Sequence, residues 1–288
     1  MGDRLIMRFA TLLDAGGPRI AIVAGERATI LDMPGAGLGS MRELAAAGAA
    51  GLSNIRDWLG DGRDRPSSSL EELRPGPVMP DPGAIYAIGL NYGPALGADP
   101  DRPKRPMVYA KLPGSVAANG ATLTWDRALT ANVDAEVELG VVIGAAAHKV
   151  APGEAMAHVF GYTCINDVSS RDPWLDGDQW LLGKSMPGFC PVGPVIVTAD
   201  EIDPTDLRLG CTINGIAIQD GSTSQMRFSI PEAISYLSHH VVLRPGDLIA
   251  TGTPARLPGP LGPDRHLQPG DVATVWIEQI GELTTNIA

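Results

Sequence analysis

The sequence predicts a mixed, β-rich α+β fold, and three observations lead to that class. From residue 78 onward, short apolar segments such as IYAIGL, MVYAKL and VGPVIVT alternate with turn-forming residues, as strands do. Helical periodicity is confined to a few segments, chiefly 40–59 and the stretch PEAISYLSHHVV that begins at residue 231. Two Pro-Gly-Asp turns, at 245–247 and 269–271, each precede a strand, which is typical of a meandering β fold and not of repeated βαβ units.

The first part of the chain predicts a small α/β domain. Residues 4–33 contain three short apolar segments, LIMRFATLL, IAIVAG and ATILDM, separated by the turn-forming sequences DAGGPR and GER. A helix is expected over 40–59, where leucine and isoleucine recur among many alanines. The polar segment GDGRDRPSSS that follows is rich in residues that break regular structure. We therefore expect a small domain over 1–75 and a larger one over 76–288.

The composition argues against several classes of partner. The chain has 288 residues and a net charge of -11, whereas nucleic acids and anionic membranes require clustered lysine and arginine. No apolar run approaches the roughly 20 residues of a membrane span, and the first residues lack the apolar middle of a signal peptide. Cys164, Cys190 and Cys211 are an odd number without close spacing, which fits buried thiols in a reducing compartment. We expect a cytoplasmic protein; a small anionic substrate, which needs only a local cation, is compatible with this charge.

The segment VDAEVELGVVIG at 133–144 contains the clearest candidate for a metal site. In an extended strand, residues two apart share a face, so Asp134, Glu136 and Glu138 line up on one side. The segment ends as an apolar run typical of a strand covered on both faces, where neighbouring carboxylates repel one another unless a cation holds them. Carboxylate ligands without zinc-type histidine or cysteine spacing favour Mg²⁺ or Mn²⁺, with Ca²⁺ as an alternative. The competing interpretation is a solvated acidic face.

A third carboxylate ligand has to come from another part of the fold. Asp167, in GYTCINDVSSRD, is the best candidate because a strand ends there in a polar turn, although an Asx-type turn explains the same pattern. Lys184 lies in the Gly- and Pro-rich segment QWLLGKSMPGFCPVGP, where its charge would neutralise a substrate carboxylate or an enolate oxygen. The sequence TGTP at 251–254 offers backbone N–H groups and hydroxyls for an anion. The last two patterns also occur in solvated surface loops.

Taken together, these segments resemble a known family. The order NY…E-x-E…ND-x-SSRD…QW-x-x-GKS…GP…NG…PGD-x-I-x-TGTP, from residue 85 to the C-terminus, is similar to that of the fumarylacetoacetate hydrolase family. The resemblance implies a β-sandwich roll with a small N-terminal domain, usually in a homodimer, and a bound Mg²⁺ or Mn²⁺. The metal ligands that it implies are Glu136, Glu138 and Asp167. The resemblance gives Lys184 a catalytic role, and the substrate-binding residues that it implies are Tyr92, Arg171, Gln179 and Thr253.

Three positions depart from the family pattern. Hydrolytic members usually carry N-Y-x-x-H-x-x-E, whose histidine and glutamate activate water, but this chain has Ala95 and Ala98 there. Pro187 stands where aspartate is common, and Arg256 follows TGTPA where glycine is usual. Alanine cannot accept a proton, and loss of a general base typically costs ~10²–10⁴-fold in rate. The metal-binding half of the site is therefore predicted to be intact and the water-activating half absent.

The sequence thus predicts a divalent-metal-dependent enzyme of this family. We expect it to act on a 2-oxo acid or an acylpyruvate-like substrate through a metal-bound enolate, with cleavage of a C–C bond as the default reaction. A decarboxylase or a keto–enol tautomerase or isomerase is the first alternative, because those reactions need the metal as an electron sink but no activated water. The second alternative is a non-catalytic homologue that binds a metal and a ligand.

Overall fold

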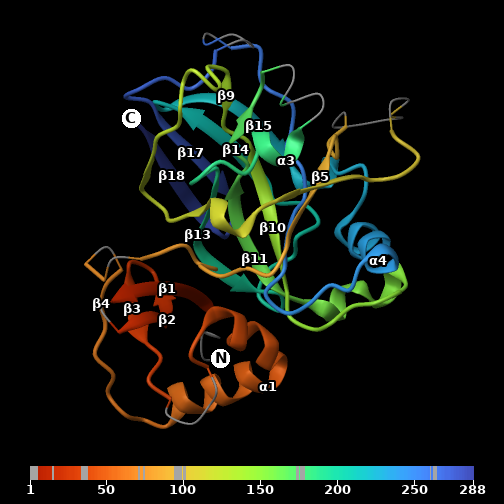
Figure 1. The fold of residues 1–288 in the computed structure, drawn as a ribbon. Coiled ribbons are helices and arrows are strands. Elements are labelled where there is room, and N and C mark those ends of the chain that lie inside the picture. Colours follow the sequence, from red (N-terminus) through yellow and green to blue (C-terminus); the bar gives the residue numbers. More distant parts are fainter. Residues whose placement is uncertain are drawn as a thin grey trace.

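One long mixed sheet runs through the molecule and joins strands from the N-terminal and central parts of the chain (Figure 1). The computed structural model describes residues 6–14, 16–33, 38–70, 72–73, 75–93, 99, 102–172, 175, 179–259, 261 and 265–288. In spatial order the strands are β4 (Ser68–Ser69), β3 (Arg27–Ile30), β2 (Gly17–Ala24), β1 (Arg8–Asp14), β13 (Cys190–Thr198), β11 (Val159–Asn166), β10 (Val137–Ile143), β16 (Leu248–Ala250), β5 (Ile85–Gly89) and β6 (Met107–Lys111). The short β7 (Val116–Ala117) pairs with β13 in parallel.

The centre of this sheet is almost entirely apolar. β10 lies between β11 and β16, antiparallel to both, and every one of its residues is buried. The apolar run LGVVIG predicts a strand covered on both faces, and β10 confirms it. Gly140 is needed in this strand because a Cβ there would lie 2.8 Å from the side chain of Ile165 on the neighbouring strand.

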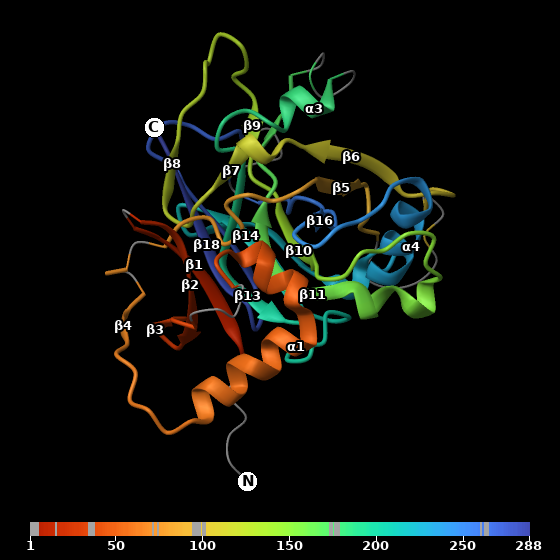
Figure 2. The same cartoon turned by 60° about the horizontal axis from the view of Figure 1, so that its bottom comes forward.

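A second sheet packs face to face against the first. Its strands in spatial order are β15 (Ile216–Ser222), β14 (Arg208–Ile213), β17 (Val272–Ile277), β18 (Gly281–Ile287) and β8 (Ala121–Leu123). β18 lies against β13 (Figure 2), and β14 and β17 lie against β10 and β11. Apolar side chains from both sheets, including Val141, Cys164, Val275 and Leu283, form the core between them. The burial of these aliphatic side chains is the main force that holds the two layers together.

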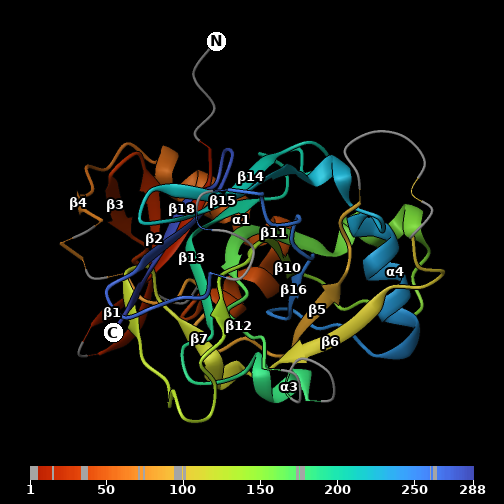
Figure 3. The same cartoon turned by 90° about the horizontal axis from the view of Figure 1, so that it is seen from above.

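Few helices accompany the sheets. The described residues include the α-helices α1 (Met41–Gly60), α3 (Trp180–Gly183) and α4 (Ile230–His240), and the short 3₁₀ helices η1 (Pro113–Ser115), η2 (Pro152–His158) and η3 (Thr223–Gln225). α1 and α4 each begin at a serine whose side chain accepts the N–H of a glutamate three residues later, and the glutamate returns the bond. α1 changes direction at Gly48, which has a φ of 53°. Figure 3 shows α3 near one end of β6 and α4 on the side of β5.

The N-terminal strands continue the main sheet. β1 pairs antiparallel with β13, which places Phe9 opposite Ile196. The rings of Phe9 and Phe160 lie 6.3 Å apart between centroids, and the apolar face of α1 joins the same buried cluster. In Figure 1 this red and orange part lies below the remainder of the chain. The division at residue 75 stays a prediction, and one continuous sheet crosses it.

The predicted fold class is confirmed. The helix expected over 40–59 appears as α1, and the stretch from residue 231 appears as α4. The two Pro-Gly-Asp turns directly precede β16 and β17. All three cysteines are buried and free, as predicted. Among the described residues, no helix combines the length and the apolar character that a membrane crossing requires.

Candidate active site

The acidic strand directs three carboxylates toward one cavity. β9 (Val133–Asp134) pairs with β12 (Ser169–Ser170) and leads directly into β10. Asp134, Glu136 and Glu138 line a cavity of about 480 Å³, hereafter the site cavity. The intervening residues that are buried in the core are Val133, Ala135, Val137 and Leu139. The predicted alternation of the strand is therefore confirmed.

Asp167 reaches the same place from the end of β11. Because β10 and β11 are antiparallel, with Val137 opposite Asn166, the residue after β11 comes back beside Glu136. The backbone N–H of Asp167 donates to the carbonyl oxygen of Glu136 at 2.9 Å. Carboxylate oxygens of Glu136, Glu138 and Asp167 all lie within 4.8 Å of one another. An all-oxygen set of this kind is what a hard divalent cation prefers.

Glu138 provides a test of whether these residues fit a cation. It is 1% exposed, and its Oε2 accepts the N–H of Gly252 at 2.8 Å. Glu136 and Asp167 are ion-paired, whereas no ion pair of Glu138 is found among the residues that the structure describes. Burial, together with the negative charge of Asp167, raises the pKa of Glu138 well above its ordinary value. A buried carboxylate that has no ion-pair partner among the described residues is stabilised by a bound cation, so the three acids fit one.

Lys184 places its ammonium group against two of these carboxylates. Its backbone N–H closes α3 by donating to the carbonyl of Trp180 at 3.0 Å. Its Nζ donates to Glu136 Oε2 at 3.1 Å, to Asp167 Oδ2 at 2.5 Å and to Ser169 Oγ at 2.6 Å. Burial opposes the charge, but Asp167 and Glu136 outweigh it and raise the pKa of Lys184 above its ordinary value. Lys184 is thus a buried, positively charged group and not a solvated loop residue.

Two residues of β6 complete this cluster, and the sequence reasoning missed both. Tyr109 donates its hydroxyl to Asp167 Oδ2 at 2.7 Å, and Lys111 forms an ion pair with the other oxygen of Asp167. Although burial opposes ionisation, Lys111 and Lys184 lower the pKa of Asp167 below its ordinary value. Tyr109 also meets Trp180 of α3 edge to face, with centroids 5.3 Å apart. The missed signal was the spacing in MVYAKL, which puts Tyr109 and Lys111 on one face of an otherwise apolar strand.

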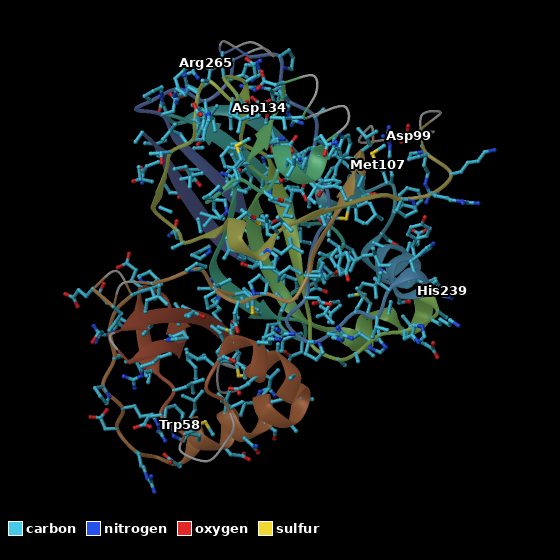
Figure 4. All side chains as sticks on the ribbon, viewed as in Figure 1. Trp58, Asp99, Met107, Asp134, His239 and Arg265 are labelled. Atoms are coloured by element: carbon cyan, nitrogen blue, oxygen red, sulfur yellow. The ribbon has the colours of Figure 1, made fainter. Side chains whose placement is uncertain are left out.

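Asp134 is surrounded by basic side chains. Its carboxylate lies 3.3 Å from Arg171 Nε, 3.2 Å from Arg256 Nη1 and 2.8 Å from His266 Nδ1. Arg171 also forms an ion pair with Glu136 and so bridges two carboxylates of the strand. Asp134 is therefore an ion-paired residue and not part of a solvated acidic face. Figure 4 shows Asp134 and Arg265 at the same end of the molecule, far from Trp58 in the N-terminal part.

The TGTP turn forms part of the cavity wall. Gly252 has a φ of +95°, and a Cβ there would lie 2.7 Å from Asn91 Cβ, so only glycine lets this backbone approach Glu138. Thr253 lines the cavity, and its Oγ1 accepts a hydrogen bond from Gln219 Nε2 at 2.7 Å. Tyr92 also lines the cavity, and burial raises its pKa, so its hydroxyl keeps its proton.

Some predicted positions are not brought into the cavity. Gln179 is exposed just before α3 and is not among the lining residues, so its role in substrate binding stays a prediction. Ala95 and Ala98 lie outside the described residues. Within the described part of the lining there is no histidine, and the only carboxylates are those of Asp134, Glu136 and Glu138.

Known proteins are similar to this chain in sequence and in fold. The family profile described as fumarylacetoacetate (FAA) hydrolase C-terminal matches residues 84–288. An uncharacterized protein from Staphylococcus aureus strain USA300 is 40% identical over 213 residues, which are 74% of this chain and 71% of the relative. Among solved structures, a fumarylacetoacetate hydrolase from Exiguobacterium antarcticum has a TM-score of 0.83 at 31% identity and covers 98% of this chain and 99% of its own.

Two further solved structures differ in the reaction that they are named for. Maleylpyruvate hydrolase from Sphingobium sp. SYK-6, in complex with manganese(II) and pyruvate, has a TM-score of 0.79 at 26% identity, covering 98% of this chain and 99% of its own. A 2-hydroxyhepta-2,4-diene-1,7-dioate isomerase from Mycobacterium marinum has a TM-score of 0.74 at 29% identity, covering 98% of each chain. Since the family profile matches most of the length of this chain, the chain belongs to the fumarylacetoacetate hydrolase family.

Proposed function

We propose that this protein is a divalent-metal-dependent enzyme that acts on a 2-oxo acid or an acylpyruvate-like substrate, with cleavage of a C–C bond as its default reaction. The observation that carries the proposal is the convergence of Glu136, Glu138 and Asp167 within 4.8 Å, beside a cavity that Lys184 lines. The related maleylpyruvate hydrolase, whose structure contains manganese(II) and pyruvate, supports both the metal and the 2-oxo acid.

The residues around the proposed metal divide the chemical work. A Mg²⁺ or Mn²⁺ ion held by the three carboxylates would act as a Lewis acid toward the oxygens of a 2-oxo acid. Lys184 is 5% exposed and positively charged, so it would stabilise negative charge that develops on the substrate. It would also return a proton to the substrate carbon. Tyr109 orients Asp167 through its hydroxyl, and burial raises its pKa so that it stays protonated. Tyr92, Arg171 and Thr253 line the remaining wall and would bind the substrate.

A decarboxylase or a keto–enol isomerase is the second candidate, and one observation favours it. The described lining of the site cavity contains no histidine that would remove a proton from water. Decarboxylation and isomerisation need no such base, and the related isomerase from Mycobacterium marinum shares the fold. Hydrolysis needs a water molecule to attack the acyl carbon, so that the C–C bond breaks and a carboxylate and a 2-oxo acid leave.

A paired assay separates these reactions. The protein, loaded with Mn²⁺, is given an acylpyruvate and, separately, oxaloacetate, while loss of the enol absorbance and release of product acids are followed. Acyl cleavage that a chelator abolishes supports the hydrolase. Metal-dependent release of CO₂, or ketonisation without cleavage, supports the second candidate. No Mn²⁺ binding and no metal-dependent turnover of either compound would reject the proposal as a whole.

A further inference from the structure

Among the residues that the structure describes, the charges around the site cavity leave a positive surplus once a divalent cation is bound. The four carboxylates of the site are those of Asp134, Glu136, Glu138 and Asp167. The four permanent cations that contact these carboxylates are Lys111, Lys184, Arg171 and Arg256. These charges cancel when every carboxylate is ionised, as metal binding requires of its ligands. Arg227, which also lines the cavity, is balanced separately by a two-point contact with Asp99. A divalent ion therefore leaves two positive charges for the substrate to balance.

Arg256 is the least compensated of the cations that line the cavity. In the described part of the chain, Lys184 and Arg171 each contact at least two carboxylates, whereas the carboxylate that Arg256 contacts is that of Asp134, which it shares with Arg171. Its Nη2 donates to the backbone carbonyl of Arg265 at 2.6 Å, an acceptor without net charge. Its Nε–H is buried and has no acceptor among the described residues. A guanidinium group in this state has both charge and a hydrogen-bond donor left for a ligand.

The position of Arg256 separates it from the proposed metal ligands. Asp134 precedes Glu136 by two residues on the same face of an extended segment, which corresponds to roughly 7 Å along the chain. Arg171 bridges the two carboxylates, and Arg256 contacts only the farther one. The lining of the same cavity also includes apolar groups, among them Ile218 and Pro254. A short carbon chain with an acidic group at each end matches a cavity that offers two separate charged positions and an apolar wall.

We propose that Arg256 binds the second acidic group of a dianionic substrate. The substrate class is then a 2-oxo acid or an acylpyruvate that carries a carboxylate at its far end. This inference rests on the proposed function, because it assumes that the 2-oxo acid end lies at Glu136, Glu138 and Asp167. A carboxylate accepts two N–H groups of a guanidinium at once, so it would satisfy the buried Nε–H and balance the charge. A substrate with a methyl group at its far end would leave both unsatisfied.

The test is a binding measurement on the full-length protein loaded with Mn²⁺. Isothermal titration calorimetry compares 2-oxoadipate with 2-oxohexanoate, which differ only in a terminal carboxylate and a terminal methyl group. For the unchanged protein we expect tighter binding of 2-oxoadipate. Arg256→Met should weaken binding of 2-oxoadipate by about ten- to a hundredfold and leave that of 2-oxohexanoate unchanged. Arg256→Lys should fall between the two, because lysine keeps the charge but not the planar pair of donors.

Control measurements distinguish an effect on ligand binding from an effect on folding or on Mn²⁺ affinity. Arg208→Met removes an exposed arginine of β14, whose side chain is 65% exposed, and should change neither Kd. The Mn²⁺ affinity of Arg256→Met should equal that of the unchanged protein. Its thermal unfolding should stay cooperative, with a lower melting temperature because the contacts with Asp134 and the Arg265 carbonyl are lost. Equal weakening of both ligands, or no preference for 2-oxoadipate in the unchanged protein, would overturn the role of Arg256. If neither ligand binds in a Mn²⁺-dependent way, the proposed function itself fails, which is a distinguishable outcome.

Discussion

At the scale of single residues, Glu138 is the group whose chemistry would depend most on the proposed metal. It is a buried acid that accepts the N–H of Gly252, and its two neighbouring carboxylates already have lysine or arginine partners. Its pKa is raised by burial and by Asp167, so it holds a proton in the metal-free protein under conditions where an exposed glutamate is ionised. Metal binding must displace that proton.

We predict that Glu138→Gln weakens Mn²⁺ binding by about a hundredfold or more, because the amide keeps the shape but loses the ligand charge. The melting temperature of the metal-free variant should be unchanged, because the neutral amide replaces a carboxyl group that already holds a proton in that state. Calorimetric titration with Mn²⁺ and a thermal melt measure the two quantities. Glu282→Gln, at an exposed position of β18, is the matched control. Unchanged Mn²⁺ affinity in Glu138→Gln would remove Glu138 from the metal site.

Lys184 and Lys111 both bind Asp167, yet we predict different effects of removing them. Lys184 lines the cavity, so Lys184→Met should lower turnover about 10²–10⁴-fold and leave Mn²⁺ affinity equal or higher. Lys111 is not among the lining residues and is 1% exposed, so Lys111→Met should cost about 3 kcal/mol in the free energy of unfolding. Steady-state rates, Mn²⁺ titration and urea unfolding separate the two effects. A fully active Lys184→Met protein would exclude Lys184 from catalysis.

The sequence predicts part of this site and leaves another part hidden. The alternation around Glu136 and the order of the motifs bring together the three acids and Lys184, because strand geometry and family resemblance both carry that information. The partners on β6 were missed, since pairing of Tyr109 and Lys111 with Asp167 joins segments 56 or more positions apart along the chain. The sequence identifies Arg256 only as a residue that differs from the family pattern. Its contact with Asp134 is visible only in the structure.

At the scale of elements, the two Pro-Gly-Asp turns contain the same hydrogen bond. In each turn the aspartate accepts the backbone N–H of the residue three positions earlier, at 2.7 Å in both cases. Asp271, which directly precedes β17, also accepts hydrogen bonds from Asn214 and Arg265 at 2.8 Å each. Burial opposes ionisation of Asp271, but the Gln268 N–H and Arg265 outweigh it and lower its pKa. The turn is therefore stabilised by a charged carboxylate.

We predict that Asp271→Asn destabilises the protein by about 1–3 kcal/mol at neutral pH and by much less in acid. Because the pKa of Asp271 is lower in the folded than in the unfolded state, its contribution is present above the unfolded value of about 3.9. That contribution is lost as the pH falls through the folded pKa. Urea unfolding of both proteins at neutral and acid pH measures the difference. The exposed Asp81→Asn is the control, and a destabilisation that does not change with pH would contradict the assignment.

The positions of the strands along the chain are easier to predict from this sequence than which strands pair with one another. The apolar runs identify β5, β10 and β13 because alternation and burial are local properties. The pairing of β16 with both β10 and β5 joins segments far apart in the sequence, and no local pattern specifies it. The same holds for β1 and β13, whose pairing depends on packing of Phe9 against Phe160.

At the scale of the whole molecule, the chain carries a net negative charge, whereas the described groups around the site cavity carry a net positive charge once a divalent cation is bound. The net charge of -11 argues against polyanionic partners, while the basic groups around Asp134 give a small anion a local binding site. The homodimer and the cytoplasmic location that the sequence implies stay predictions. The division into domains also stays a prediction, and it has a direct physical test.

We predict that residues 76–288 alone do not form a stable protein. Without residues 1–75, the edge of β13 that β1 now covers would be exposed. An apolar cluster that includes Val142, Phe160 and Ile196 would be exposed as well. Size-exclusion chromatography should show aggregation, and thermal unfolding should lose its cooperative transition. As a control, full-length protein cut once within 61–69 should remain associated and bind Mn²⁺, because the shared sheet and core hold the pieces together. Cooperative unfolding and full Mn²⁺ affinity of 76–288 alone would instead show that the larger part is self-sufficient, with β1 as a dispensable edge.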